Sequence, residues 1–221
     1  MPKVSEEYIL NKKKMITEAA YELCLEKTVS TVTMQDIINR TGLSQGGIYR
    51  FYRDIDEVFA DMLMAMREKV SVKAKVDEIF DRANELPAGE ITNQVFEMLA
   101  EFMTEELMGI EKVDFELSVL AMNAPERVEK ILAGAEGVGN MEYIMQRTSD
   151  FLKQKMSSGE LKARVSGMEL LTYISSAYSG IQMCCIVNNC YRKGPMSGFY
   201  QPKMQLRTLA KTVNYLLGAE E

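Results

Sequence analysis

The chain has 221 residues, 47% of them hydrophobic and 26% charged, which is typical of a soluble globular protein with an ample core. It contains no histidine, the commonest general base and metal ligand, so we expect no enzyme, no metal site and no cofactor. The lack of an apolar run of 18 residues and of an apolar signal core at the N-terminus predicts a cytoplasmic protein. In that compartment its four cysteines are expected to be free thiols.

Charge is distributed unevenly along the chain. Residues 1–53 carry eight Lys and Arg against six Asp and Glu, which is a net charge of +2. Because the whole chain has a net charge of −6, the remaining residues carry a net charge of −8. A mildly basic segment on an acidic body can bind DNA locally while the body repels non-specific contact with phosphates. An excess of two charges can also arise by chance, so the charge pattern alone leaves the partner open.

The first expected helix runs from about Ser5 to Glu26. Lys12, Lys13 and Lys14 lie in its N-terminal half, where they are either a solvated face or contacts to DNA phosphates. Its apolar residues recur at helical spacing and predict one buried stripe, made of Met15, Ile16, Ala19, Ala20, Leu23 and Cys24.

Residues 33–52 predict two short helices joined by a tight turn. Thr33 can cap the first helix, and Asp36 at its third position completes a capping box. Gly42 stands where this helix must end, because glycine tolerates the left-handed conformation, and Ser44 can cap the second helix. By spacing alone, this unit is either an ordinary helical corner or a helix-turn-helix that reads DNA.

The residue types in this stretch are more specific than their spacing. They resemble the DNA-binding signature of the TetR family of bacterial regulators, in a match that spans residues 8–63 and includes Thr33, Asp36, Ile37, Gly42, Leu43, Ser44, Gly46, Ile48, Tyr49 and Tyr52. The resemblance implies an all-α protein with an N-terminal three-helix helix-turn-helix domain, residues 1–53. It also implies a C-terminal helical domain for effector binding and dimerisation, residues 54–221. The expected function is a sequence-specific transcriptional regulator, a repressor released by a small hydrophobic ligand.

The second helix of the pair is the expected recognition helix. Its small polar start suits close approach to base edges in the major groove, while Tyr and Arg behind it reach phosphates. Family members usually carry Thr or Ser in place of Gly47 and Lys in place of Ile55, so the alternative is a helical effector-binding dimer with weakened DNA binding. The predicted DNA-binding residues are Thr33, Ser44, Gln45, Gly46, Gly47, Tyr49, Arg50, Tyr52 and Arg53.

Further helices are expected after residue 53, and no strand pattern is present. Asp54 can cap the first of them, Asn123 can cap a helix with Pro125 in its first turn, and Ser166 with Glu169 forms a second capping box. Residues 84–89 and 193–202 are expected to be loops. The expected helices run from residue 54 to the mid-seventies and over residues 90–108, 114–122, 123–134, 140–157, 167–189 and 203–217.

Seventeen methionines, many of them after residue 90, suggest an adaptable apolar pocket, because Met is flexible and polarizable. The alternative is that these side chains simply fill the core. The family resemblance implies a small-molecule inducer site among these helices. The predicted ligand-binding residues are Met62, Met66, Phe96, Phe102, Met103, Phe115, Met122, Tyr143, Met145, Tyr173 and Tyr178.

The helix expected over residues 167–189 is apolar around most of its circumference, so it must be covered on nearly all sides. The resemblance implies that the last two long helices pair with those of a second copy in a four-helix bundle. Such a two-fold dimer would read the two half-sites of a palindromic operator in double-stranded DNA. The predicted dimer residues are Leu170, Ile174, Ile181, Leu206, Leu209, Val213 and Leu216.

Overall fold

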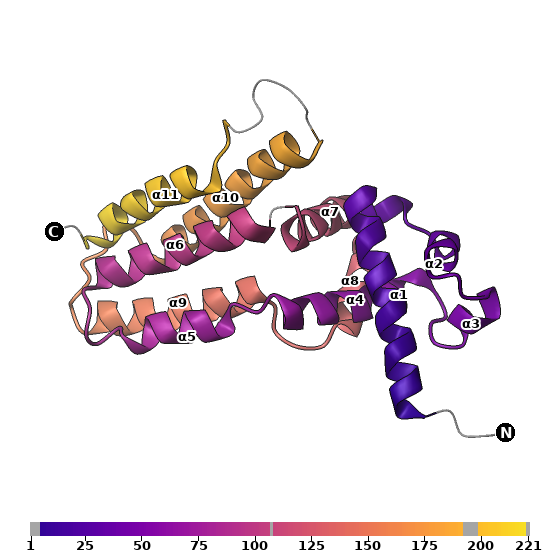
Figure 1. Ribbon diagram of the computed structural model, residues 1–221. Coiled ribbons are helices and arrows are strands. Elements are labelled where there is room, and N and C mark those ends of the chain that lie inside the picture. Colours follow the sequence, from indigo (N-terminus) through magenta and orange to yellow (C-terminus); the bar gives the residue numbers. More distant parts are fainter. Residues whose placement is uncertain (1–4, 107, 192–198, 220–221) are drawn as a thin grey trace. The chain divides into compact units, whose positions relative to one another are not determined.

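The computed structural model describes residues 5–106, 108–191 and 199–219 (Figure 1). All regular structure within these segments is helical, so the predicted all-α fold is confirmed. The described chain divides into two compact units, one made of residues 1–70 and 112–137 and the other of residues 71–111 and 138–221. We call these the first unit and the second unit.

These compact units are drawn differently from the expected domains, residues 1–53 and 54–221. The first unit extends beyond residue 53 because α4 (Ile55–Lys69) packs against both α1 (Glu6–Glu26) and α8 (Pro125–Gly134). A functional boundary after residue 53 therefore stays a prediction, whereas the packing boundary lies after residue 70.

The first unit holds the predicted helix pair. Its further elements are η1 (Val29–Thr31), α2 (Met34–Thr41), α3 (Gln45–Tyr49) and most of α7 (Ile110–Asn123). Large apolar side chains from several of these helices are fully buried and form its core, namely Ile16, Ile37, Ile48, Phe59, Met62, Leu63 and Ile131. Burial of this kind is the main force that keeps short helices such as α3 folded.

The second unit contains α5 (Lys73–Asp81), α6 (Ala88–Glu106), α9 (Asn140–Ser157), α10 (Gly167–Ile186), the π-helical turn η2 (Val187–Tyr191) and α11 (Pro202–Leu217). Helix α11 packs against α6 and α10, while α5 packs against α6 and α9 (Figure 1). The fully buried side chains of this unit are Ile91, Met103, Leu170, Ile186 and Leu206.

Helix α10 together with η2, residues Gly167–Tyr191, is unusually apolar for a helix with so much open surface. By length and composition it could cross a membrane. Its most apolar stretch of 18 residues has a mean hydropathy of 1.4, yet only 22% of that stretch is buried. One such helix is weak evidence for a membrane span. A single copy of the chain covers only part of this helix, so its burial on nearly all sides, with a second copy as partner, stays a prediction.

Several predicted helix ends agree with the structure to within two residues, and others differ from it. The helix that starts after Asp54 ends at Lys69 instead of the mid-seventies, and α5 then begins separately at Lys73. Asn123 is the last residue of α7, so Ala124 occupies the N-cap position of α8 and Asn123 does not cap it. The predicted loop over residues 193–202 lies mostly outside the described residues.

Candidate functional site

The helix-turn-helix is held by local hydrogen bonds at each of its corners. The Thr33 side chain accepts from the Asp36 amide at 3.2 Å and Asp36 Oδ2 accepts from the Thr33 amide at 2.8 Å, which is the predicted capping box. Lys27 Nζ lies 2.5 Å from Asp36, and this bond, with those from Thr33, lowers the pKa of the Asp36 carboxyl to about 2. Gly42 ends α2 at a φ of 67°, as predicted for a left-handed C-cap.

The expected recognition helix, α3, presents a nearly bare start to solvent. The Ser44 side chain caps it by accepting from the Gly47 amide at 3.1 Å, while Gln45 and Gly46 are exposed. Tyr49 is 44% exposed, and Arg50 is exposed and has no ion-pair partner among the described residues. This arrangement leaves Gln45, Tyr49 and Arg50 available to reach another molecule.

Two of the predicted DNA contacts are engaged within the chain. Tyr52 is 2% exposed, so its side chain packs in the core and is not available to DNA, which corrects that prediction. Arg53 is exposed, but its guanidinium lies 2.6 Å from Glu57, whose carboxylate also accepts from the Arg53 amide. Thr33 and Ser44 are exposed and act as helix caps.

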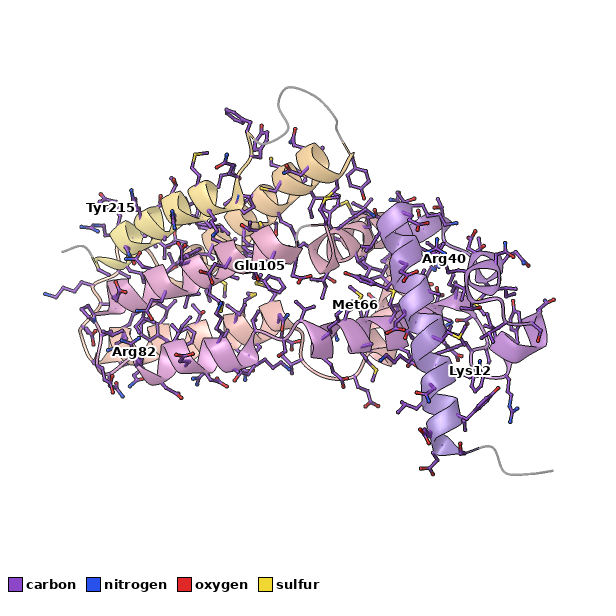
Figure 2. The ribbon with its side chains drawn as sticks, viewed as in Figure 1. Lys12, Arg40, Met66, Arg82, Glu105 and Tyr215 are labelled. Atoms are coloured by element: carbon purple, nitrogen blue, oxygen red, sulfur yellow. The ribbon has the colours of Figure 1, made fainter. Side chains whose placement is uncertain are left out.

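Other basic residues of the first unit are also paired. Arg40 lies 3.0 Å from Glu22 and 2.6 Å from Glu26, and Lys13 lies 2.8 Å from Asp61. Lys12, labelled with Arg40 in Figure 2, lies over the ring of Tyr8 at 5.7 Å from its centroid. Several of the basic side chains near the helix-turn-helix are therefore paired at short range, whereas Arg50 has no ion-pair partner among the described residues.

The second unit contains a cavity of about 110 Å³. All the lining residues from α5 and α6 are buried, and we call this part the deep wall; the remaining wall is formed by α9, α10 and α11. The lining residues are Phe80, Ile91, Thr92, Val95, Phe96, Leu99, Met141, Ile144, Met145, Thr148, Phe151, Leu152, Leu171, Ile174, Ser175, Tyr178, Ser179, Val213 and Leu217.

The lining of this cavity is apolar and carries no Asp, Glu, Lys or Arg among the described residues. The lining residues that are exposed, Met141 and Met145 on α9 and Ser175 and Ser179 on α10, mark its open side between these two helices. On the deep wall, the hydroxyl of Thr92 already donates to the Ala88 carbonyl at 2.9 Å. The cavity therefore combines a mostly apolar lining with the exposed residues Ser175 and Ser179.

The structure brings together some of the predicted ligand-binding residues. Phe96, Met145 and Tyr178 line the cavity. Within the same unit, Phe102, Met103, Tyr143 and Tyr173 are not among the lining residues; Tyr173 is 40% exposed and the Tyr143 hydroxyl donates to Asp77. The other predicted residues, Met62, Met66, Phe115 and Met122, belong to the first unit.

Sequence analysis missed most of the deep wall. Ile91, Val95 and Leu99 follow each other at intervals of four residues, which places them on one face of α6. Ile144, Thr148 and Phe151 follow at intervals of four and three residues, which places them on one face of α9 in the remaining wall. This spacing was visible in the sequence, but it does not tell a cavity wall from an ordinary core face.

Several predicted dimer residues are already covered within one copy of the chain. Leu170, Leu206, Leu209 and Val213 are between 0% and 5% exposed, so they pack inside the second unit and are not free for a partner, which corrects that prediction. Ile174, Ile181 and Leu216 are partly exposed. The apolar residues with most open surface on α10 and α11 are instead Met168, Met183, Met204 and Tyr215, and Figure 2 shows Tyr215 on the outer side of α11.

Comparison with known proteins agrees with this arrangement. Residues 16–62 match the model of the family described as bacterial regulatory proteins, tetR family. An uncharacterized HTH-type transcriptional regulator of Bacillus subtilis (strain 168), YfiR, is 21% identical over 212 residues, which cover 94% of this chain and 96% of that protein.

Solved structures share the fold over nearly the whole chain. A putative TetR-family regulator from Mesorhizobium loti MAFF303099 has a TM-score of 0.63 at 12% identity, covering 94% of this chain and 96% of that one. FadR of Thermus thermophilus, a TetR-family repressor solved in complex with lauroyl-CoA, has a TM-score of 0.56 at 15% identity and covers 95% and 96%. These relatives regulate transcription and are not enzymes. In residues 16–62 the chain is similar to the tetR family of bacterial regulatory proteins, and over nearly its whole length it shares the fold of TetR-family regulators.

Proposed function

We propose that this regulator is a homodimeric repressor, released from a palindromic operator when a small hydrophobic ligand fills the cavity of the second unit. The observation that carries the proposal is the apolar lining of that cavity, which holds no charged side chain. A charged group placed there would lose its hydration without a partner, which is strongly unfavourable. The ligand is therefore an apolar body whose polar end stays at the opening.

The distribution of polar groups in the cavity lining supports a ligand with an apolar body and one polar end. Its deep wall is buried and apolar, while the hydroxyl groups of Ser175 and Ser179 lie at the open side between α9 and α10. An alkyl chain would enter first and leave a hydroxyl, ester or carboxylate end at these serines. The lauroyl-CoA bound by FadR of Thermus thermophilus has such a chain, which supports this class of ligand.

Release from DNA needs only a modest coupling between the two sites. A tenfold loss of operator affinity corresponds to about 1.4 kcal/mol, and allosteric coupling is typically about 1–3 kcal/mol. Each buried methylene contributes about 0.8 kcal/mol, so a few groups that are covered in only one conformation supply that difference. Reciprocity then requires operator DNA to weaken ligand binding by the same factor.

The open surface of α10 and α11 supports dimerisation. Only 22% of the apolar 18-residue stretch of α10 and η2 is buried. A second copy of the same two helices can cover the apolar surface that remains open. A two-fold dimer would present two α3 helices at the spacing of successive major grooves, about 34–36 Å. Regulators of this family act as cytoplasmic DNA-binding dimers, and we propose the same for this chain.

The cavity is tested with the uncharged dye N-phenylnaphthylamine, whose fluorescence rises on transfer to apolar surroundings. We expect the wild-type protein to bind it, decanol to displace it, and decyltrimethylammonium to displace it poorly. Met145→Trp, at a residue that lines the opening, should weaken binding at least tenfold, or about 1.4 kcal/mol. Gln146→Trp, at the exposed neighbour outside the lining, is the matched control. Equal dye affinity in both variants would contradict this assignment of the site.

DNA binding is tested by gel shift with the DNA that flanks the gene of this protein. A sequence-specific shift that decanol reverses supports a ligand-released repressor. The alternative, an effector-binding dimer with weakened DNA binding, is favoured by the engagement of Lys13 with Asp61 and of Arg53 with Glu57, and by the missing side chain at Gly47. It would be supported by dye binding without any specific shift at low salt.

A further inference from the structure

Two methionines lie at the open side of the cavity, between α9 and α10. Met141 is 37% exposed and Met145 is 43% exposed, and both side chains line the cavity. They are four residues apart on α9, so they lie on the same face of this helix. Each side chain therefore borders solvent as well as the apolar interior of the cavity.

No other described methionine combines exposure with a place in this lining. Core methionines such as Met62 and Met103 are at most 1% exposed, so a reagent in water does not reach them in the folded protein. Met156 is 37% exposed and lies on the same helix as Met141, but it does not line the cavity. Within the described chain, a reagent that modifies exposed thioethers therefore changes the cavity lining only at Met141 and Met145.

The thioether of an exposed methionine reacts with a peroxide. The sulfur attacks one oxygen of hydrogen peroxide, the O–O bond breaks, and the sulfur keeps that oxygen as a sulfoxide while the second oxygen leaves as water. The sulfur loses two electrons and the peroxide gains them, so no further reactant is needed. A sulfoxide is a polar hydrogen-bond acceptor. Placing it against an apolar ligand removes its hydration without supplying a donor, which is unfavourable.

We propose that Met141 and Met145 form a peroxide-sensitive modification site that controls the affinity of the cavity for apolar ligands. In the reduced state the flexible thioethers cover the apolar body of a ligand at the open side. In the oxidised state the sulfoxides stay in water or accept hydrogen bonds from the hydroxyl groups of Ser175 and Ser179 on α10, so that cover is lost. The effect on ligands rests on the proposed function of the cavity, whereas the oxidation itself does not. A peroxide would then keep the repressor on its operator at ligand concentrations that release the reduced protein.

The test is titration of the full-length protein with N-phenylnaphthylamine before and after treatment with hydrogen peroxide. Dithiothreitol is added after the peroxide, because it reverses disulfides and sulfenic acids of the four cysteines but leaves methionine sulfoxide intact. We expect the dissociation constant of the dye to rise about fivefold or more, and peptide mass spectrometry to find sulfoxide at both residues. Methionine sulfoxide reductases A and B should then restore the original affinity, since together they reduce both sulfoxide epimers.

Leucine variants assign the effect to this pair of methionines. The double variant, Met141→Leu with Met145→Leu, has no thioether at the open side, and leucine has a volume close to that of methionine. Met156→Leu is the matched control, because Met156 lies on the same helix at 37% exposure but outside the lining. The ratio of dissociation constants after and before peroxide is compared within each protein, so a change in starting affinity does not enter. This ratio should stay close to one in the double variant and should equal that of the wild type in Met156→Leu.

Three results would overturn the proposal: unchanged dye affinity in wild-type protein that carries sulfoxide at Met141 and Met145, an equal loss of affinity in the double variant, or sulfoxide at Met156 without sulfoxide at the pair. Failure of the proposed function gives a different signature, because the wild type then binds no dye before any peroxide is added. Dye binding that decanol displaces, followed by no response to peroxide, would keep the ligand function and reject this modification site.

Discussion

The Tyr52 hydroxyl donates a hydrogen bond to Asp61 Oδ2 at 2.9 Å, and Lys13 Nζ lies 2.8 Å from the same oxygen. The Lys13 ammonium also lies over the Tyr52 ring, 5.1 Å from its centroid. One carboxylate of α4 thus ties together α1 and the segment that follows α3. This contact helps to hold the segment that follows α3 in place within the first unit.

Tyr52→Phe should therefore lower the free energy of unfolding by about 1–2 kcal/mol, because it removes a hydrogen bond to a charged group from a buried side chain. Urea denaturation measures this change. Tyr49→Phe is the control, since Tyr49 is 44% exposed, and its effect on stability should stay within about 0.5 kcal/mol. Equal destabilisation by the two substitutions would show that the Tyr52–Asp61 contact contributes nothing.

Arg50 and Arg53 should differ in their contribution to DNA binding, although both are exposed and close in sequence. Arg50 has no ion-pair partner among the described residues, whereas Arg53 is held by Glu57. We expect Arg50→Ala to weaken binding to all DNA sequences alike and to reduce the salt dependence by about one released counterion. Fluorescence anisotropy titrations at several salt concentrations measure both quantities. A larger loss for Arg53→Ala would contradict this assignment.

The two glycines of α3 should respond differently to alanine. A Cβ at Gly46 would meet no atom within 4 Å, whereas a Cβ at Gly47 would lie 3.1 Å from the capping Ser44 Oγ. Gly46→Ala should therefore stabilise the protein by about 0.5–1 kcal/mol, by reducing the entropy of the unfolded chain. Gly47→Ala should gain less, because the Ser44 cap must move. Thermal unfolding of both variants decides the order.

Cys24 should be inert in the native protein. Burial, aided by the nearby Glu116 carboxylate, raises the pKa of its thiol from an ordinary value of 9.0 to about 12. At pH 8 its thiolate fraction is then on the order of one in ten thousand, so iodoacetamide should label Cys24 only after unfolding. Peptide mass spectrometry measures the labelling.

The same raised pKa has a consequence for stability. The contribution of the neutral Cys24 thiol is fully present below pH 9, where the thiol is protonated in the folded and unfolded states. It is lost as the pH rises from 9 towards 12, because the unfolded chain releases its proton first. Rapid labelling of the folded protein at pH 8 would contradict the burial of this thiol.

The proposed dimer interface is tested on the open face of α10. Ser176→Arg places a charge on an exposed position of α10, so it should dissociate the dimer while leaving each copy folded. Leu209→Glu should instead unfold the protein, because Leu209 is only 5% exposed within one copy. Light scattering and circular dichroism separate these outcomes. Gln146→Arg, on an exposed position of α9, is the control and should remain dimeric.

The caps that begin and end the helices were predictable because they depend on residues three or four positions apart. Thr33 with Asp36, Ser44, Asp54, and Ser166 with Glu169 cap their helices as predicted, and Gly42 ends α2. Each of these hydrogen bonds forms within one turn of helix, so the neighbouring sequence determines it. The helix-turn-helix and its family were readable from the sequence for this reason.

Long-range packing decided the features that the sequence left open. The sequence suggested Tyr52 as a DNA contact and Leu209 as a dimer contact, but tertiary contacts bury both side chains within one copy of the chain. The buried Lys112–Glu116 pair resembles an ordinary solvated pair at i and i+4 in the sequence. The Lys112 ammonium can be buried because the Cys24 carbonyl, 88 residues away in the sequence, accepts a hydrogen bond from it. Neighbouring residues in the sequence do not reveal such a distant partner.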